Sequence, residues 1–241
     1  MTSASPPRTP SGASRPAVPG GAAAHSALLV LAETLLVFGV VLVLGLTVPM
    51  ARDHLLTLIA VALPVQGLLA LAAERHALAR HGLSWQAVGF RRPTRSLWHL
   101  LWELPVAILA LVAVQGAALA LLGEAPGSGA GLAEDADVIG PGSALLIVLA
   151  TAVLTPLWEE ALFRGLVLGA ARRRWGTAWA VVVSALVFAA AHGFPLLLPY
   201  LVTMGLLLAW LRVRHESLWA SLALHSSVNL MASSAVLAAV A

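Results

Sequence analysis

The chain has 241 residues, of which 60% are hydrophobic and 10% are charged. A soluble domain carries about 25% charged residues, so this chain has too little polar surface to cover a globule in water. It has no cysteine, which excludes disulfide frameworks, thiol nucleophiles and cysteine-based zinc sites. Its basic residues are all arginines, gathered in short clusters between apolar runs. That pattern is typical of charge flanking membrane spans and argues against a nucleic-acid partner.

Residues 1–26 are rich in Pro, Ser, Ala and Gly and predict a disordered N-terminal tail. Long apolar runs separated by short polar breaks then predict one membrane-embedded helical domain over 27–241. Because the runs are continuous and do not alternate, they favour helices over barrel strands. A span needs about 20 residues, and an eighth, re-entrant segment is compatible with the pattern. The candidate spans are 27–50, 55–73, 98–122, 143–169, 176–192, 195–212 and 217–240.

The distribution of arginines predicts the orientation of these spans. Twelve of the 14 arginines lie in the tail and in three loops on one side, at 74–97, 172–174 and 212–214. The opposite side holds Arg52 and an acidic loop containing Glu124, Glu134, Asp135 and Asp137. The positive-inside rule then places the N-terminus in the cytoplasm. We therefore expect an all-α polytopic membrane protein of about seven transmembrane helices, with membrane lipid as a partner.

Three charged residues interrupt the fourth span. Glu160 and Arg164 are four positions apart, so they share a helix face and can form an ion pair. Glu159 points about 100° away and has no such partner, which leaves its carboxylate available as a general base. A buried ion pair that fixes helix packing would explain Glu160 and Arg164 but not Glu159. Pro156, just upstream, frees a backbone carbonyl and can kink the helix near the carboxylates.

Two further polar groups lie in later spans. His192 follows Phe188 by four positions at the end of the fifth span, and His225 precedes Asn229 by four in the seventh. Interfacial packing could explain His192, and helix–helix hydrogen bonding could explain the other two. Together with the carboxylates, these groups could activate water and stabilise an oxyanion. Glu159, His192 and His225 could instead hold a metal ion such as zinc.

Depth in the membrane bears on which of these groups can meet. Glu33 and Glu103 lie within about two turns of the predicted cytoplasmic ends of their spans, which favours interfacial positions outside the site. Counted from the same side, His192 lies about 9 Å deeper than Glu159. A helix tilt, a kink at Pro156 or a shifted start of the fifth span would have to absorb that difference.

The order of the three motifs resembles a known family. Glu-Glu-x-x-x-Arg at 159–164, Phe-x-x-x-His at 188–192 and His-x-x-x-Asn at 225–229 are similar to the signature motifs of the CAAX-protease and bacteriocin-processing (CPBP or ABI) family of intramembrane proteases. The flank Ser-Leu-Trp-Ala at 217–220 is also similar. The resemblance covers about residues 143–240, which we take as the protease-like core.

This resemblance implies an enzyme like the type 2 CAAX prenyl endopeptidases. It would hydrolyse a peptide bond of a membrane-associated or lipidated peptide or protein in the bacterial cell membrane. By analogy with the family, Glu159 would activate the water and His192 would help to hold it. His225 and Asn229 would stabilise the oxyanion.

The resemblance gives Glu160 and Arg164 the role of bracing the site. Members of the family are often named as metalloproteases, and a metal-free glutamate mechanism is also proposed for them, so both routes stay open here. The zinc signature His-Glu-x-x-His is absent. The alternatives are a non-catalytic scaffold or bacteriocin-immunity-type protein of the same fold, or a small transporter with a proton relay. The transporter is disfavoured because no inverted repeat is visible.

Overall fold

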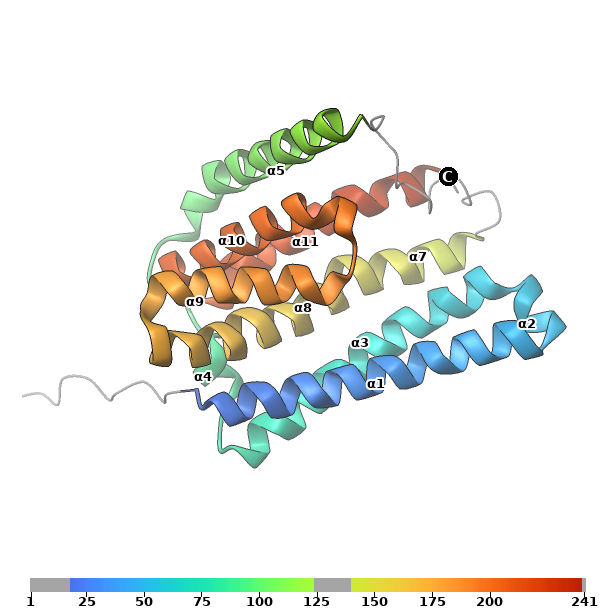
Figure 1. Ribbon diagram of the computed structural model, residues 1–241, viewed down its shortest axis with the longest axis horizontal. Coiled ribbons are helices and arrows are strands. Elements are labelled where there is room, and N and C mark those ends of the chain that lie inside the picture. Colours follow the sequence, from blue (N-terminus) through green and yellow to red (C-terminus); the bar gives the residue numbers. More distant parts are fainter. Residues whose placement is uncertain (1–17, 124–139, 240–241) are drawn as a thin grey trace, which may run out of the picture.

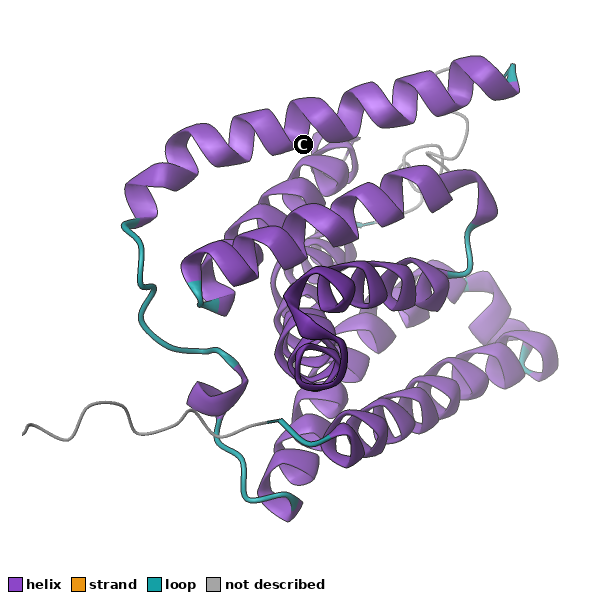
Figure 2. Ribbon diagram, turned by 60° about the vertical axis from the view of Figure 1, so that its left-hand side comes forward, coloured by secondary structure: helices purple, strands orange, loops and turns teal. Residues whose placement is uncertain are grey.

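The computed structural model describes residues 18–123 and 140–239, with side chains described as far as 233. Within these ranges the regular structure is helical and includes no strand (Figure 2). This confirms the predicted all-α membrane fold. It follows from the long apolar runs, since only a helix satisfies every backbone hydrogen bond within a single segment.

The helices appear in the following order along the chain. They are α1 Gly20–Thr47, α2 Pro49–Asp53, α3 Leu55–Arg80, α4 Trp85–Val88, η1 Leu97–His99, α5 Leu100–Leu122, α7 Pro141–Leu149, η3 Ala150–Leu154, α8 Thr155–Glu159, η4 Glu160–Val167, α9 Leu168–His192, η5 Pro195–Leu197, α10 Leu198–His215 and α11 Leu218–Ala239.

The helices form a bundle with a central group and two flanks (Figure 1). α1 and α3 lie side by side on one flank, and α5 lies on the other, packed against α10 and α11. The central group consists of the segment from α7 to η4 together with α9, α10 and α11. Its core is formed by large apolar side chains such as Phe163, Phe188, Leu208 and Leu224. The polar residues of the predicted site lie on these central helices.

In the described part of the chain, five helices are long and apolar enough to cross a membrane: 20–47, 55–80, 97–122, 141–192 and 195–215. The fourth of these contains two predicted spans. Gly176 interrupts it with φ 77° and ψ 177°, a backbone conformation that side chains with a Cβ rarely adopt, and the chain reverses there (Figure 1). α11 corresponds to the last predicted span. A helix therefore covers each of the seven predicted spans.

The first span begins earlier than predicted. The tail was expected to reach residue 26, but α1 starts at Gly20, directly after Pro19. The run of alanines at 22–24 has high helix propensity, and the apolar side chains of Ala22 and Ala23 are buried in the bundle. Of the predicted tail, residues 1–17 lie outside the described part of the chain.

The earlier helix start changes the position of Glu33. This residue lies 13 positions after Gly20, which is about 20 Å along the helix from its first residue. One carboxylate oxygen accepts hydrogen bonds from Gln66 Nε2 of α3 at 3.0 Å and from Thr34 Oγ1 at 3.1 Å. Glu33 therefore makes a polar contact between two membrane helices, which the sequence did not predict.

Glu103 is also held by side chains of another helix. It is buried in the first turns of α5, where its carboxylate accepts hydrogen bonds from Arg214 Nε and from His215 Nε2, the latter at 2.8 Å. Both partners belong to the last turn of α10. Glu103 therefore ties the cytoplasmic end of α5 to the central helices, outside the predicted site.

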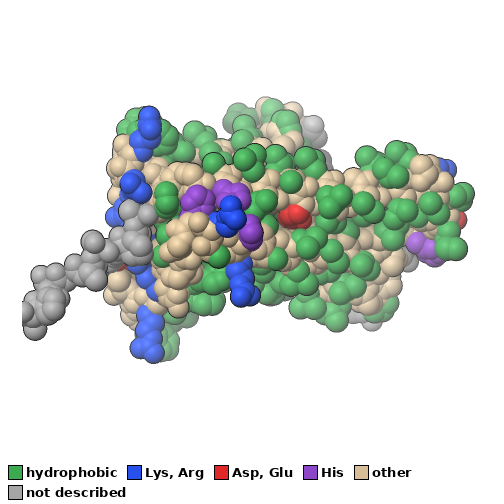
Figure 3. All heavy atoms as spheres, turned by 90° about the horizontal axis from the view of Figure 1, so that it is seen from below, with side chains coloured by type: hydrophobic (Ala, Val, Ile, Leu, Met, Phe, Trp, Pro, Cys, Tyr) green, Lys and Arg blue, Asp and Glu red, His purple; other side chains and the backbone are tan. Residues whose placement is uncertain are grey.

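The molecular surface agrees with a membrane location. Hydrophobic side chains cover most of the face in Figure 3, while arginine side chains gather toward one end. Many large apolar residues of α1, α3 and α5 are exposed, including Leu28, Leu68 and Leu109. A soluble protein would bury such side chains, so these faces contact lipid.

Candidate active site

The helix that carries the carboxylates is not regular. Two wide π-helical turns, η3 at Ala150–Leu154 and η4 at Glu160–Val167, flank the short helix α8. In η3 the N–H of Thr155 donates to the carbonyl of Ala150, one residue further back than in an α-helix. Pro156 follows and has no N–H to donate. The carbonyl of Thr151 therefore loses both of its usual donors within the helix.

Asn229 of α11 supplies the missing donor. Its Nδ2 lies 2.8 Å from the carbonyl oxygen of Thr151. A second contact between the same two helices joins Thr151 Oγ1 and Ser233 Oγ at 2.9 Å. The amide of Asn229 thus compensates for the proline and fixes α11 against η3.

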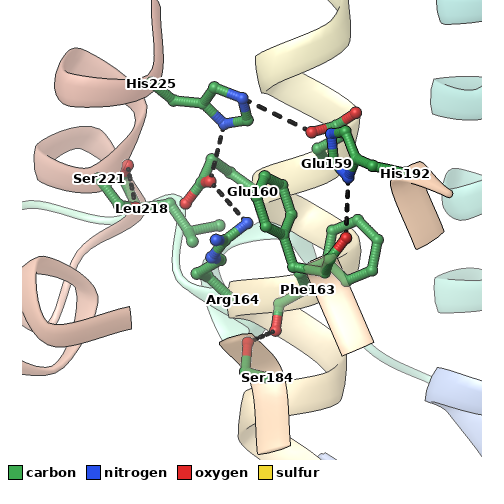
Figure 4. A network of polar contacts seen from close by, with 10 residues as sticks. Glu159, Glu160, Phe163, Arg164, Ser184, His192, Leu218, Ser221 and His225 are labelled. Carbon is green, nitrogen blue, oxygen red and sulfur yellow. Dashed lines mark hydrogen bonds and ion pairs between the residues drawn. The ribbon is translucent and has the colours of Figure 1, made fainter. Parts of the chain in front are cut away.

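Glu160 lies at the centre of the polar cluster (Figure 4). Its side chain is fully buried, and Oε1 lies 3.1 Å from the guanidinium of Arg164, as the four-residue spacing predicted. The same oxygen lies 3.0 Å from Nδ1 of His225 on α11. Glu160 is therefore held by a cation on its own helix and by an imidazole from another.

Arg164 is also fully buried, and an aromatic side chain covers its charge. Its guanidinium carbon lies 4.1 Å from the centroid of the Phe188 ring and 5.8 Å from that of Phe163. A cation over an aromatic face gains about 2 kcal/mol or more when it is desolvated. Arg164 therefore has two stabilising contacts, one anionic and one aromatic.

Glu159 is 6% exposed and points to the other side of His225 (Figure 4). Its Oε2 lies 3.5 Å from Nε2 of His225 and has no hydrogen-bond partner among the described residues. Among the described residues, no arginine forms an ion pair with Glu159, whereas Arg164 does so with Glu160. His225 therefore lies between the two carboxylates, one constrained and the other free to accept a proton.

His192 completes the cluster from the end of α9. Its Nδ1 lies 2.8 Å from the carbonyl oxygen of Phe188, and a carbonyl can only accept, so Nδ1 carries the proton. In the neutral ring this leaves Nε2 as an acceptor. The ring of Phe188 lies 4.5 Å from that of His192 and 5.9 Å from that of His225, between centroids, so the predicted depth difference of about 9 Å does not keep His192 out of the cluster (Figure 4).

The structure thus brings together five of the six predicted site residues: Glu159, Glu160, Arg164, His192 and His225. Asn229 lies one turn beyond His225 on α11, and its amide N–H donates to a backbone carbonyl. The described contacts do not join it to either carboxylate.

The predicted metal ligands do not form a metal-binding group. Among the described residues, no three His, Cys, Asp or Glu side chains are placed to hold an ion. Nδ1 of His192 faces a carbonyl, which leaves Nε2 as its acceptor, and each nitrogen of His225 faces a carboxylate. Zinc binding therefore stays a prediction.

Sequence reasoning gave no role to two residues that shape the site. Ser184 donates from Oγ to the carbonyl of Phe163 at 2.9 Å, and the ring of Phe188 lies against Arg164, His192 and His225. The spacing could have predicted their involvement, because Ser184 and Phe188 precede His192 by eight and four positions and so share its face of α9. This face holds α9 against η4.

A hollow of about 300 Å³ opens between α7, η3 and α11. Its lining is mainly apolar and includes Ala152, Val153 and Leu230, together with Ser226. None of the six predicted site residues is among the residues that line it.

Comparison with known proteins agrees with the motif resemblance. Residues 141–231 match a family model described as Type II CAAX prenyl endopeptidase Rce1-like. The matched segment runs from α7 into α11 and includes all six predicted site residues. No curated protein and no solved structure matches the chain. The family match confirms the resemblance and points to a protease in general.

Proposed function

We propose, on the premise that residues 141–231 belong to the Rce1-like family of type II CAAX prenyl endopeptidases, that this protein is an intramembrane endopeptidase. It would cleave a membrane-associated or lipidated peptide in the bacterial cell membrane. The buried position of the site supports this substrate class, because a peptide held at the membrane can reach membrane helices that a soluble peptide cannot.

Glu159 is our choice for the general base. The observation that carries the proposal is the contrast between the two adjacent carboxylates. Oε1 of Glu160 contacts Arg164 at 3.1 Å and His225 at 3.0 Å, and the side chain is fully buried. The nearest charged partner described for Glu159 is His225 at 3.5 Å, and its side chain is 8% exposed, so water can reach it. A base must have a free lone pair within reach of the proton that it removes.

The reaction would proceed by direct attack of water. Glu159 takes a proton from the water. At the same time the water oxygen forms a bond to the carbonyl carbon of the scissile peptide. The imidazole of His225, between the two carboxylates, donates to the resulting oxyanion, and Nε2 of His192 orients the water. The carbon–nitrogen bond then breaks, and the proton held by Glu159 passes to the leaving amine. Glu160 and Arg164 keep His225 in position.

The test is cleavage of a farnesylated peptide by purified protein in lipid vesicles, with the unlipidated peptide as comparison. E159Q should lower kcat by about 10²–10⁴-fold, the usual contribution of general acid–base catalysis. E33Q is the matched control, since Glu33 is a membrane glutamate outside the site, and it should cleave at the wild-type rate. Cleavage by E159Q at the wild-type rate would refute the assignment.

A chelator resolves the choice between mechanisms. We propose the metal-free glutamate route, so activity should survive dialysis against a strong chelator. Loss of activity on chelation, with recovery on adding zinc, would contradict this choice while leaving the endopeptidase function intact.

A further inference from the structure

A second hollow lies at the cytoplasmic start of α5, away from the candidate active site. Its volume is about 530 Å³, and it is lined by polar residues of the preceding loop and apolar residues of the helix start. The polar side includes Arg92 and Arg95, and the apolar side includes Leu97, Trp98 and Leu101. Nothing in the proposed proteolysis uses this hollow.

The two arginines are available to an anion. Both are exposed, and the described structure gives neither of them an acidic partner or a hydrogen bond. The neighbouring Arg91 differs, because its Nε donates to the backbone carbonyl of Glu216 at 2.8 Å. Guanidinium groups bind phosphate oxygens in a bidentate manner, so two of them at one hollow suit a phosphate group.

The apolar side matches the tail of an amphiphile. Trp98 is 78% exposed and Leu101 is 68% exposed, at the beginning of a 26-residue apolar span. Tryptophan at such a position is typical of the boundary between headgroups and acyl chains. An occupant must therefore present an anion to the loop and hydrocarbon to α5.

The backbone that carries the arginines is held in place. The loop before α5 is joined to the turn between α10 and α11 by hydrogen bonds from Leu218 N to Gly89 O, from Thr94 N to His215 O and from Ser217 Oγ to Arg91 O. At the other side of the hollow, Glu103 fixes α5 to the last turn of α10. A preformed site loses little conformational entropy on binding.

We propose that this hollow binds an anionic phospholipid of the cytoplasmic leaflet. The phosphate lies between Arg92 and Arg95, and an acyl chain follows Leu97 and Leu101 along α5. Basic pockets on the cytoplasmic side of membrane helices attract anionic headgroups in this way. The bound lipid joins the arginine loop to α5 and stabilises the folded bundle.

The test uses the full chain in neutral detergent, with phosphatidylglycerol or phosphatidylcholine of identical chains added. Phosphatidylglycerol should raise the Tm of wild type by about 4 °C or more, since a ligand that binds only the folded state stabilises it. R92Q/R95Q should lose most of that rise. R75Q/R80Q is the matched control, because these arginines are also exposed at a cytoplasmic helix end, and it should respond like wild type.

Further measurements distinguish binding of the lipid from binding of other anions. Native mass spectrometry should show phosphatidylglycerol retained by wild type and by R75Q/R80Q, and lost from R92Q/R95Q. W98A/L101S keeps both guanidiniums and should also lose retention. The proposal would be overturned if phosphatidylglycerol raised the Tm of R92Q/R95Q as much as that of R75Q/R80Q. It would also be overturned if inorganic phosphate alone raised the Tm of wild type as much as phosphatidylglycerol does. If R92Q/R95Q folds poorly, lipid retention by W98A/L101S decides the matter, with wild-type retention refuting the site.

Discussion

The buried pair of Glu160 and Arg164 allows the most quantitative test of the site. Substituting Arg164 by Met keeps most of the apolar length of the side chain but removes the charge. Glu160, fully buried, then keeps only His225 as a partner. Breaking a buried ion pair by removing one partner costs about 3–5 kcal/mol. For a chain of this size each kcal/mol lowers Tm by about 2–4 °C, so R164M should lower it by roughly 6–20 °C.

Thermal unfolding of the purified protein in detergent measures this effect, and two variants make the result specific. Arg174 also lies over an aromatic ring, that of Trp175 at 5.6 Å, but is exposed, so R174M should change Tm by no more than about 2 °C. E160Q/R164M removes both charges and should recover at least half of the loss. Wild-type Tm for R164M, or a double variant no more stable than the single one, would refute the pairing argument.

Three further substitutions test other parts of the structure by the same measurement. N229L leaves the Thr151 carbonyl without its donor and should cost about 1–3 kcal/mol, so an unchanged Tm would contradict the role given to that hydrogen bond. E74Q should keep or raise Tm, because Glu74 is fully buried and neither carboxylate oxygen has a hydrogen-bond partner among the described residues; a large drop would reveal a missed contact. E103Q weakens the bonds from Arg214 and His215 and should lower Tm, and no effect would show that α5 is held by its apolar contacts alone.

The membrane architecture could be read from local composition. A continuous apolar run of about 20 residues has few stable conformations in a bilayer other than a helix, so each predicted span corresponds to a helix. Helix ends were less predictable. α1 begins at Gly20 because the alanines after it pack into the bundle, and that packing depends on distant residues. The earlier helix start places Glu33 more than three turns from the first residue of α1.

The pairing of Glu160 with Arg164 was also predictable, because positions four apart in a helix share a face whatever surrounds them. The same geometry separated Glu159 from Glu160, and the structure has the two carboxylates on different nitrogens of His225. Local periodicity could not predict which histidine contacts the two carboxylates, since His225 lies 65 positions after Glu160.

The sequence by itself determined the helices and the set of chemical groups in the site, since these depend on composition and on spacing within one helix, while the orientation in the membrane stays a prediction. Only the tertiary structure decided that Asn229 pairs with the Thr151 carbonyl, that Phe188 covers Arg164 and that Glu103 anchors α5. Each of these contacts joins different helices. Their partners are selected by packing and by the need to satisfy buried polar groups, which in a membrane can turn only to one another.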